Sequence, residues 1–188
     1  MKGRISFRFG IAVFLLGFLG GCAYPLSQKV QNFARKDLTY PVVVQSPKKY
    51  EGTTVIWGGM ISDVRNGKDG GRVAILEAPL DRRGNPQLQT IRGMFIAKTD
   101  RYLDPKVYQK GKKVTLAGDV LGEETKTIGA VPYIYPVILI LELHLWDEPL
   151  AKLPENFKES LELGIPFLSP FEEPPGGYPQ EDPIGPRE

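Results

Sequence analysis

Two residues of this sequence could do chemistry that no other residue duplicates: its only cysteine, Cys22, and its only histidine, His144. A single cysteine excludes an intramolecular disulfide framework and a cysteine-based metal cluster, and a single histidine excludes every two-histidine metal motif. The acidic residues show no spacing typical of a catalytic carboxylate pair. We therefore expect no metal, no cofactor and no enzymatic activity, which leaves the sulfur of Cys22 as the most informative reactive group.

Cys22 follows a segment with the composition of an export signal, residues 1–21. Three basic residues open it, and an apolar run from 9 to 19 follows, which is too short to span a bilayer because crossing takes about 20 apolar residues. The run ends in Leu19-Gly20-Gly21-Cys22, which resembles the lipobox of bacterial lipoproteins. That resemblance implies cleavage between Gly21 and Cys22, a diacylglycerol thioether on the sulfur and an N-acyl chain on the new amine.

Such a lipid would anchor the chain to a membrane without spanning it, since each buried acyl CH₂ contributes about 0.8 kcal/mol and two chains anchor stably. The residue after Cys22 is Ala23, whereas Asp at this position is the usual inner-membrane retention signal in Gram-negative bacteria. We therefore expect anchoring in the outer membrane, in its periplasmic leaflet. The alternative, a simple signal peptide with an incidental cysteine, would leave a free thiol in an oxidising compartment.

Cleavage also changes the net charge. The full chain has 24 Lys and Arg against 22 Asp and Glu, but three of the basic residues leave with the signal, so the mature chain has 21 against 22, a formal charge of −1. Nucleic-acid binding calls for a strong basic excess. We therefore expect no nucleic-acid partner.

Polar, proline-rich segments flank the mature domain. Residues 22–49, with one short helix predicted at 28–35, are expected to form a tether that spans about 30 Å if flexible; the part at 38–44 could instead form an edge strand. Residues 149–188 contain nine of the 17 prolines and predict an extended acidic tail. A short helix at 155–163 could dock this tail on the domain.

Residues 50–148 predict a small all-β domain. Glycine and proline clusters divide it into five strands, expected at 53–65, 72–80, 88–97, 113–121 and 133–146. The sequence at 66–71 is a strong hairpin signal. Gly58-Gly59 within the first strand indicates a bulge or a sharp bend.

One short helix is expected between the third and fourth strands. Asp104 suits the N-cap, Pro105 the first helical position and Gly111 the C-terminal stop, with Val107 and Tyr108 facing inward. Three strands, a helix and two strands form the element order of a five-stranded OB-like Greek-key barrel.

The last strand alternates between two faces. One face is aliphatic throughout and consists of Val137, Leu139, Leu141, Leu143 and Leu145. We expect this face inside the barrel, so that replacing Leu141 by Asp abolishes folding, because an unpaired buried charge costs several kcal/mol. The opposite face includes Glu142, His144 and Trp146, which we expect to be at least partly exposed.

Five residues could form an aromatic ligand platform of the kind that OB-folds use: Trp57, Tyr133, Tyr135, His144 and Trp146. The alternative is that these side chains only pack in the core or against the tether. His144 could also act as an acid switch, because the unperturbed pKa of histidine lies near 6.5, but a lone strand histidine is more often a surface or packing residue.

Several short motifs are spread over about a hundred residues: Tyr50-Glu51-Gly52, Trp57-Gly58-Gly59, Pro79-Leu80-Asp81 with Gly84 and Pro86, Arg92-Gly93-Met94-Phe95, Leu103-Asp104-Pro105, Val114-Thr115-Leu116-Ala117-Gly118, Tyr135-Pro136 and Leu143-His144-Leu145-Trp146. Together these motifs resemble the Slp family of starvation-inducible outer-membrane lipoproteins. The resemblance implies a non-enzymatic outer-membrane lipoprotein associated with starvation or acid stress. It supplies no catalytic residues.

Two functional hypotheses follow. The first is a structural or envelope-stabilising lipoprotein that packs against an envelope protein or the membrane. The second is a periplasm-facing binding module that takes an oligosaccharide or peptide in a groove near 65–72 and 122–132. A binding module should expose an aromatic residue over that groove, whereas a structural protein should expose an apolar patch elsewhere.

Overall fold

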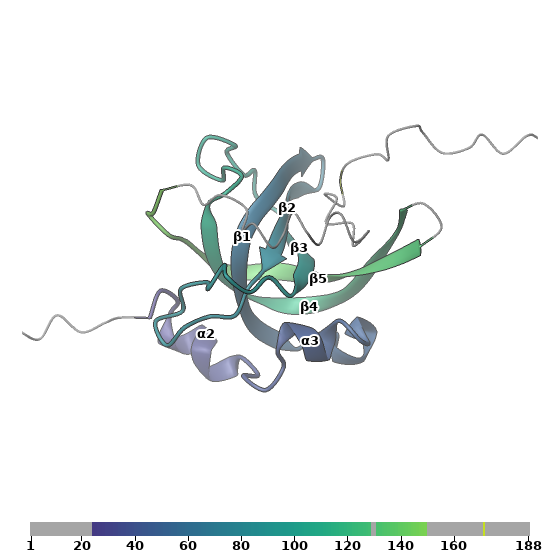
Figure 1. Ribbon diagram of the computed structural model, residues 1–188, viewed down its shortest axis with the longest axis horizontal. Helices are drawn as coiled ribbons and strands as arrows, with labels where there is room; N and C mark the ends of the chain where they lie inside the picture. Colours follow the sequence, from purple (N-terminus) through teal and green to yellow (C-terminus); the bar gives the residue numbers. More distant parts are fainter. Residues whose placement is uncertain (1–23, 129–130, 150–170, 172–188) are drawn as a thin grey trace, which may run out of the picture.

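The computed structural model describes residues 24–128, 131–149 and 171. Five strands form one sheet: β1 (Thr54–Gly67), β2 (Gly70–Glu77), β3 (Gly93–Thr99), β4 (Lys113–Ile128) and β5 (Val131–Leu145). The sheet closes into a barrel in the order β1-β2-β3-β5-β4 (Figure 1). Neighbouring strands are antiparallel except β3 and β5, which are parallel. The predicted five-stranded OB-like barrel is confirmed.

β1 is long enough to pair with two strands in succession. Residues 54–60 pair with β4, and residues 59–67 pair with β2. At the overlap a Cβ on Gly59 would lie 1.8 Å from the backbone oxygen of Leu76, so only glycine permits the approach of the two strands. β1 therefore changes partners at Gly59, but its register shift against β2 lies between Ile61 and Asp63 and not at the predicted Gly58-Gly59.

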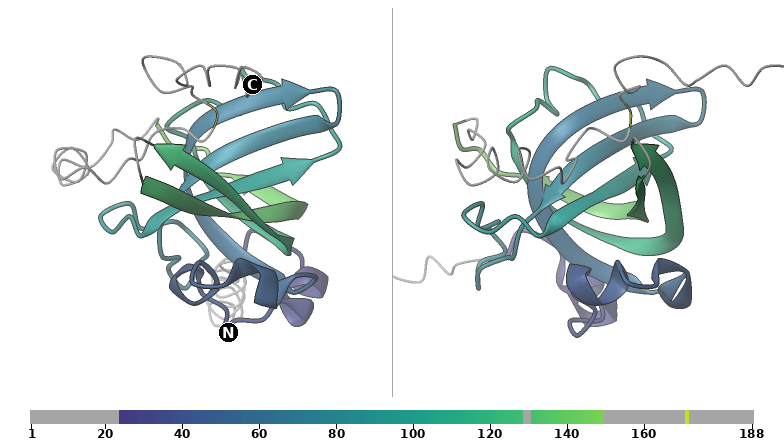
Figure 2. Two further views of the ribbon diagram at one scale, coloured as in Figure 1. Left: turned by 90° about the vertical axis from the view of Figure 1, so that its right-hand side faces the viewer. Right: turned by 45° about the vertical axis from the view of Figure 1, so that its right-hand side comes forward.

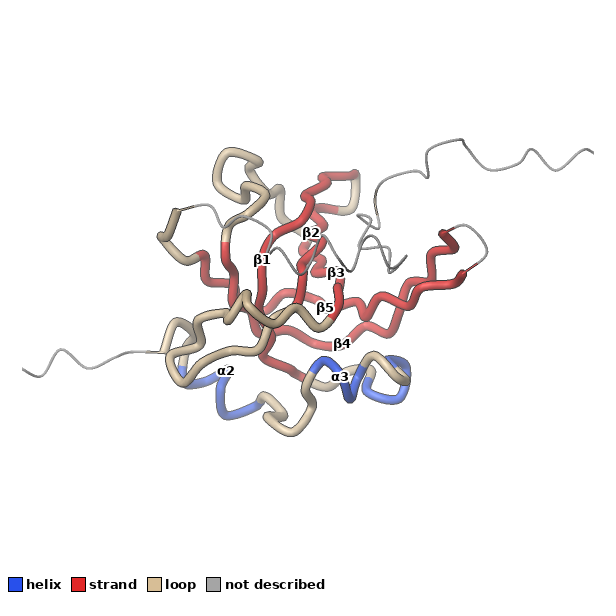
Figure 3. The backbone as a smooth tube through the Cα atoms, viewed as in Figure 1, coloured by secondary structure: helices blue, strands red, loops and turns tan. Residues whose placement is uncertain are grey.

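The described part of the expected tether is packed against the barrel. It forms α2 (Gln28–Phe33), α3 (Tyr40–Val43) and the 3₁₀ helix η1 (Pro47–Tyr50). These helices cover one end of the barrel (Figures 1 and 3). Leu38, Tyr40 and Val43 are buried in the same cluster as the barrel interior. We name residues 24–50 the N-terminal layer.

An edge strand at 38–44 does not form, and α3 takes its place. Pro41 lies in the first turn of this helix, where the missing N–H of proline removes no helical hydrogen bond. The hydroxyl of Tyr40 donates to the carbonyl of Met94 and accepts from the N–H of the same residue, both at 3.1 Å. The N-terminal layer is thereby hydrogen-bonded to β3.

β2 and β3 are buried on both faces. Their inward side chains join the interior cluster: Val73, Ile75, Phe95 and Ala97. Their outward side chains form a second cluster with residues from the β4–β5 hairpin: Ala74, Leu76, Met94, Ile96, Tyr135 and Val137. Phe171, from the C-terminal segment, packs against this second cluster. Burial on both faces explains why β2 reads as an apolar run without alternation.

The inward aliphatic face predicted for β5 is wrong for Val137, which packs in the second, outward cluster, and for Leu139 and Leu141. Leu139 and Leu141 are 37% and 48% exposed. Ile138 is fully buried, and Ile138 and Ile140 pack in the interior cluster. The interior face of this part of β5 is therefore the opposite of the one predicted.

A β-bulge at Leu141 accounts for the error. Two consecutive residues of β4 pair with Glu142 and Ile140, which leaves Leu141 without a partner. An extra residue of this kind reverses the alternation of a strand. Beyond the bulge Leu143 and Leu145 pack against the interior as predicted, and Leu141 itself faces solvent.

The helix predicted at 104–111 is a single hydrogen-bonded turn. Asp104 caps it as expected, because its carbonyl accepts from the N–H of Val107 and of Tyr108 at 2.9 Å. Gly111 has a φ of +89°, which suits the stop predicted there. Val107 is 48% exposed instead of inward, whereas Tyr108 packs against the interior cluster. The described helices belong to the N-terminal layer instead.

Two predicted boundaries also differ from the structure. The loop expected at 122–132 is mostly strand, because β4 and β5 continue as a hairpin that projects from the barrel (Figure 3). The third strand begins at Gly93 rather than at 88, so residues 79–92 form a long loop between β2 and β3. No helix in the described part of the chain is long and apolar enough to cross a membrane.

Candidate functional site

The structure separates the five residues predicted as an aromatic platform. Trp57 lies in the barrel interior and is 3% exposed. Its indole N–H donates to the carbonyl of Leu38 at 3.0 Å, and its ring makes edge contacts with Tyr40 and Phe95 at centroid distances of 5.7 and 5.3 Å. Trp57 therefore joins the N-terminal layer to the barrel.

Tyr133 and Tyr135 pack on the β4–β5 hairpin in the second cluster. The hydroxyl of Tyr135 is buried and has no hydrogen-bond partner in the described structure. His144 lies nine residues beyond Tyr135 on β5, about 30 Å along an extended strand. The two tyrosines therefore form no common surface with His144.

His144 and Trp146 do lie together at the end of β5. Their rings are in edge contact at 4.9 Å, and both side chains are half-buried. The indole N–H of Trp146 donates to the hydroxyl of Thr115 at 3.0 Å, and that hydroxyl donates to the carbonyl of Gly84. Thr115 thus joins Trp146 to the 79–92 loop.

The groove expected near 65–72 and 122–132 is closed by side-chain contacts. Arg72 and Lys98 both form ion pairs with Glu124. The ring of Phe171 lies 4.9 Å from the Arg72 guanidinium carbon. Burial works to raise the pKa of Glu124, but the hydrogen bonds from Lys98 and Arg72 outweigh it and lower that pKa.

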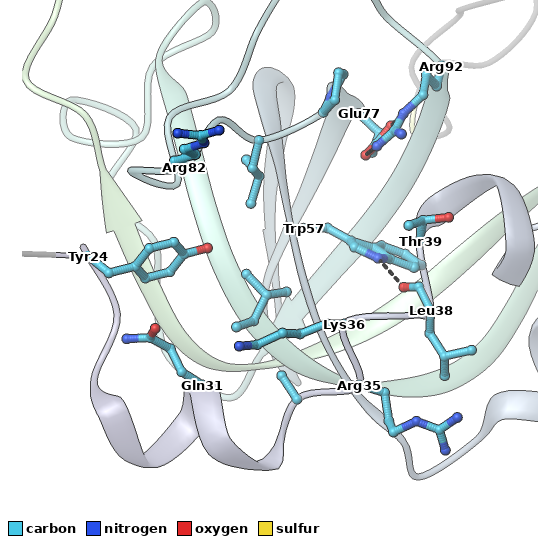
Figure 4. A pocket seen from close by; sticks show the side chains of 14 residues that line it. Tyr24, Gln31, Arg35, Lys36, Leu38, Thr39, Trp57, Glu77, Arg82 and Arg92 are labelled. Atoms are coloured by element: carbon cyan, nitrogen blue, oxygen red, sulfur yellow. Dashed lines mark hydrogen bonds and ion pairs between the residues drawn. The ribbon is translucent and has the colours of Figure 1, made fainter.

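A cleft of about 500 Å³ lies elsewhere, where the N-terminal layer meets the 79–92 loop. Its lining residues come from segment 24–39, from the same loop and its flanking residues, and from Ile56 and Trp57 of β1 (Figure 4). This volume is within the range of small-molecule sites, about 300–1,000 Å³. Segment 24–39 is predicted to be a tether, so no sequence pattern indicates that it meets a loop 40 or more residues away.

A buried ion pair forms one edge of the cleft. Arg92 donates through Nε to Glu77 at 2.8 Å and through a terminal nitrogen to the second carboxylate oxygen (Figure 4). The side chain of Glu77 is 1% exposed and that of Arg92 is 29% exposed. Burial raises the pKa of Glu77, against the opposing effect of Arg92. The pair joins the two ends of the 79–92 loop.

Two further cations line the cleft without an ion-pair partner among the described residues, Lys36 and Arg82. They lie on opposite walls, one in the N-terminal layer and the other in the loop (Figure 4). Arg35 also lines the cleft, but its guanidinium is paired with Asp37 at 2.7 Å and points away from the centre. Lys36 and Arg82 are therefore the positive charges left for a ligand.

Tyr24 closes the end of the cleft nearest the chain start (Figure 4). Its ring lies so close to Gly84 that a Cβ there would be 2.9 Å from it. Burial, and then the charge of Asp81, raise the pKa of Tyr24, so its hydroxyl stays protonated and can donate a hydrogen bond. The cleft thus offers two cations and one hydroxyl, which suits an anionic ligand.

The predicted lipid-attachment residue and cleavage site, Cys22 and Gly21, lie outside the described residues, as do the signal at 1–21 and almost all of the acidic tail at 149–188. Within the described chain no group of three or more Cys, His, Asp or Glu side chains could hold a metal ion.

Comparisons with known proteins concern nearly the whole chain. The model of a family described as the outer membrane lipoprotein Slp family matches residues 19–173. Outer membrane protein Slp of Escherichia coli (strain K12) is 26% identical over 140 residues, which cover 73% of this chain and 74% of the relative.

Solved structures were compared as well. The mitochondrial single-stranded DNA binding protein Rim1 of S. cerevisiae is 13% identical, with a TM-score of 0.31 over 50% of this chain and 95% of its own. A small single-stranded DNA-binding protein of Streptomyces coelicolor is 15% identical, with a TM-score of 0.35 over 51% and 95%.

Proposed function

The chain belongs to the outer membrane lipoprotein Slp family, and on that premise we propose that it is a non-enzymatic envelope protein whose barrel is held directly on the membrane surface by a lipid on Cys22. The lipid consists of a diacylglycerol thioether and an N-acyl chain, and it inserts into the periplasmic leaflet of the outer membrane. The role is structural or envelope-stabilising, under starvation or stress.

The short distance between Cys22 and the packed domain carries this proposal. Leu26 is 4% exposed and packs on the outer face of the barrel with Val30 and Ala117. Leu26 lies four positions after Cys22, and a fully extended chain spans at most about 3.6 Å per residue, or about 14 Å in all. A lipidated Cys22 therefore leaves no room for a spacer between barrel and bilayer.

The N-terminal layer has the side chains that a membrane surface attracts. Phe33 on α2 is 69% exposed, and Val42 on α3 is 40% exposed. Residues 24–50 contain five basic residues against one acidic residue, Asp37. Basic residues near an anionic lipid surface contribute about 1 kcal/mol each. Both features support a membrane-facing orientation of this layer.

The alternative, a module that binds an oligosaccharide or peptide in the groove at 65–72 and 122–132, has less support. Phe171 and the Arg72–Glu124 pair cover that groove. Exposed apolar side chains lie on the N-terminal layer and on the middle of β5, and also at Tyr102, Val107, Leu121 and Ile134, so their distribution alone does not separate the two hypotheses.

Fractionation of cells that express a Cys22→Ser variant tests the anchor. We expect this variant to leave the outer membrane fraction after a high-salt wash, because Phe33, Val42 and the surface lysines hold the chain only weakly. Phe33→Ser is the matched control, since it keeps the lipid and should remain with the membrane. A Cys22→Ser chain that still sediments with outer membranes would contradict the proposal.

A further inference from the structure

The cleft between the N-terminal layer and the 79–92 loop is next to the proposed point of membrane attachment. Tyr24 lines the cleft and lies two residues after Cys22, a reach of at most about 7 Å. If Cys22 carries the lipid, the headgroups of the same leaflet surround the cleft entrance. The cleft is therefore exposed to a high local concentration of phospholipid headgroups.

The polar groups of the cleft match an anionic headgroup. Lys36 and Arg82 come from opposite walls, so an anion in the cleft has a cation on each side (Figure 4). Arginine binds phosphate oxygens through two parallel N–H groups, and lysine acts as a point charge. The Tyr24 hydroxyl adds a neutral donor from a third side. The carboxylate of Glu77 does not oppose the anion, because Arg92 neutralises it.

Part of the remaining surface of the cleft is apolar, next to the polar side chains of Gln31 and Thr39. Leu38, Ile56, Pro79 and Leu80 line it together with the edge of Trp57. Inorganic phosphate has no group to place against these side chains, whereas the glycerol and the first acyl carbons of a phospholipid do. The combination of two cations with an aliphatic wall favours a lipid over a free anion.

We propose that this cleft binds the phosphate of an anionic phospholipid from the leaflet that holds Cys22. The inference rests on the proposed membrane attachment, and it assigns a ligand class to a site outside the groove that OB-folds use. Binding would fix the orientation of the barrel on the membrane, because it adds a second point of attachment to the lipid on Cys22.

The test uses the mature lipidated chain in phospholipid nanodiscs and follows the indole N–H signals of its two tryptophans by NMR. Trp57 lines the cleft, whereas Trp146 does not line it and reaches the 79–92 loop only through Thr115 and Gly84, so the Trp146 signal should respond less. Discs of phosphatidylcholine alone are compared with discs that contain increasing phosphatidylglycerol, and inorganic phosphate is added to the neutral discs in a separate arm.

We expect phosphatidylglycerol to move the Trp57 signal more than the Trp146 signal. Arg82→Gln and Lys36→Gln should each weaken this response by about tenfold, because each removes one charge-assisted contact. Lys110→Gln, which removes the same charge from the surface turn before Gly111, should leave the response unchanged.

Three results would contradict the proposal: a Trp57 signal that phosphatidylglycerol does not move, an equal loss of response in Lys110→Gln, and a full response to inorganic phosphate without any response to the lipid. A chain that fails to associate with the discs would contradict the anchor instead. In that case glycerophosphoglycerol, added to the same chain in solution, tests the cleft separately by the same Trp57 signal.

Discussion

Glu142, in the middle of the last strand, caps the first helix of the N-terminal layer through Ser27. Its carboxylate accepts hydrogen bonds from the backbone N–H of Ser27, at 2.8 Å, and from the hydroxyl of the same residue. The two residues are 115 positions apart in the chain. Glu142 directly follows the β-bulge at Leu141. Its hydrogen bonds with Ser27 therefore join the N-terminal layer to β5 of the barrel.

Ser27→Ala should lower the free energy of unfolding by about 1 kcal/mol, the usual cost of losing an N-cap. Glu142→Gln should also destabilise the protein at neutral pH. Hydrogen bonds from Ser27 lower the pKa of Glu142, so the stability that its charge contributes is present above the unfolded value of 4.5 and is lost as pH falls through the folded pKa. Thermal unfolding of the lipidated chain in detergent measures both effects. A difference between Glu142→Gln and wild type that persisted unchanged at pH 3 would contradict this assignment.

Arg92→Met should be severely destabilising at neutral pH, by about 3–5 kcal/mol, because it leaves the buried Glu77 carboxylate without a partner. Burial already raises the folded pKa of Glu77, and loss of Arg92 raises it further. The folded state then binds the proton more tightly than the unfolded state, so stability increases as pH falls from above the folded pKa toward 4.5.

Denaturant unfolding of Arg92→Met at several pH values checks this sign. The double variant Glu77→Gln with Arg92→Met is the control, because it has no buried carboxylate and should show a weaker pH dependence. Stability of the single variant that fell with decreasing pH more steeply than wild type would rule out an unpaired Glu77 as the cause.

Leu141→Asp and Ile138→Asp should have opposite outcomes although both lie on β5. Leu141 is 48% exposed at the bulge, so its replacement should change stability by about 0.5 kcal/mol or less. Ile138 is fully buried in the barrel interior, and an unpaired charge there should prevent folding. Circular dichroism and thermal melting of the two variants test which side chains of β5 face the barrel interior. Loss of folding in Leu141→Asp would contradict the exposed position of Leu141 and support the inward leucine face predicted from the sequence.

Ala23→Asp should move the chain from the outer to the inner membrane in a Gram-negative host that reads Asp after the lipidated cysteine as a retention signal. The barrel begins after this residue, so folding should not change. Density-gradient separation of the two membranes measures the distribution, and Ala23→Ser is the matched control. An unchanged outer-membrane position for Ala23→Asp would show that this residue does not direct sorting.

The strands and their order could be predicted because each apolar run is bounded by glycine or proline. Which residues of β5 face inward could not be predicted. The bulge at Leu141 depends on the pairing with β4, and no pattern in the β5 sequence itself indicates it. A local pattern predicts which residues are apolar, but the partner strand decides which of them face inward.

The N-terminal layer and the cleft were missed for a related reason. The short helix predicted at 28–35 is confirmed as α2, but α3 has only four residues, too few for a helical period to be recognised, and no pattern predicted that either helix packs on the barrel. Both helices are stable because Val30, Tyr40 and Val43 are buried against the barrel. The cleft requires that layer and the 79–92 loop to meet, and this contact between distant segments has no signature in either one.

The position of the barrel relative to the bilayer tests the central claim most directly. A fluorophore on a cysteine introduced at Phe33, in the N-terminal layer, is compared with one at Lys68, in the β1–β2 turn at the opposite end of the barrel (Figure 2). The sulfur of a lipidated Cys22 does not react, so each variant carries one label. In nanodiscs with quencher groups on the lipid headgroups, direct attachment predicts strong quenching at 33 and little at 68. Equal quenching at the two sites would contradict a barrel held directly on the membrane.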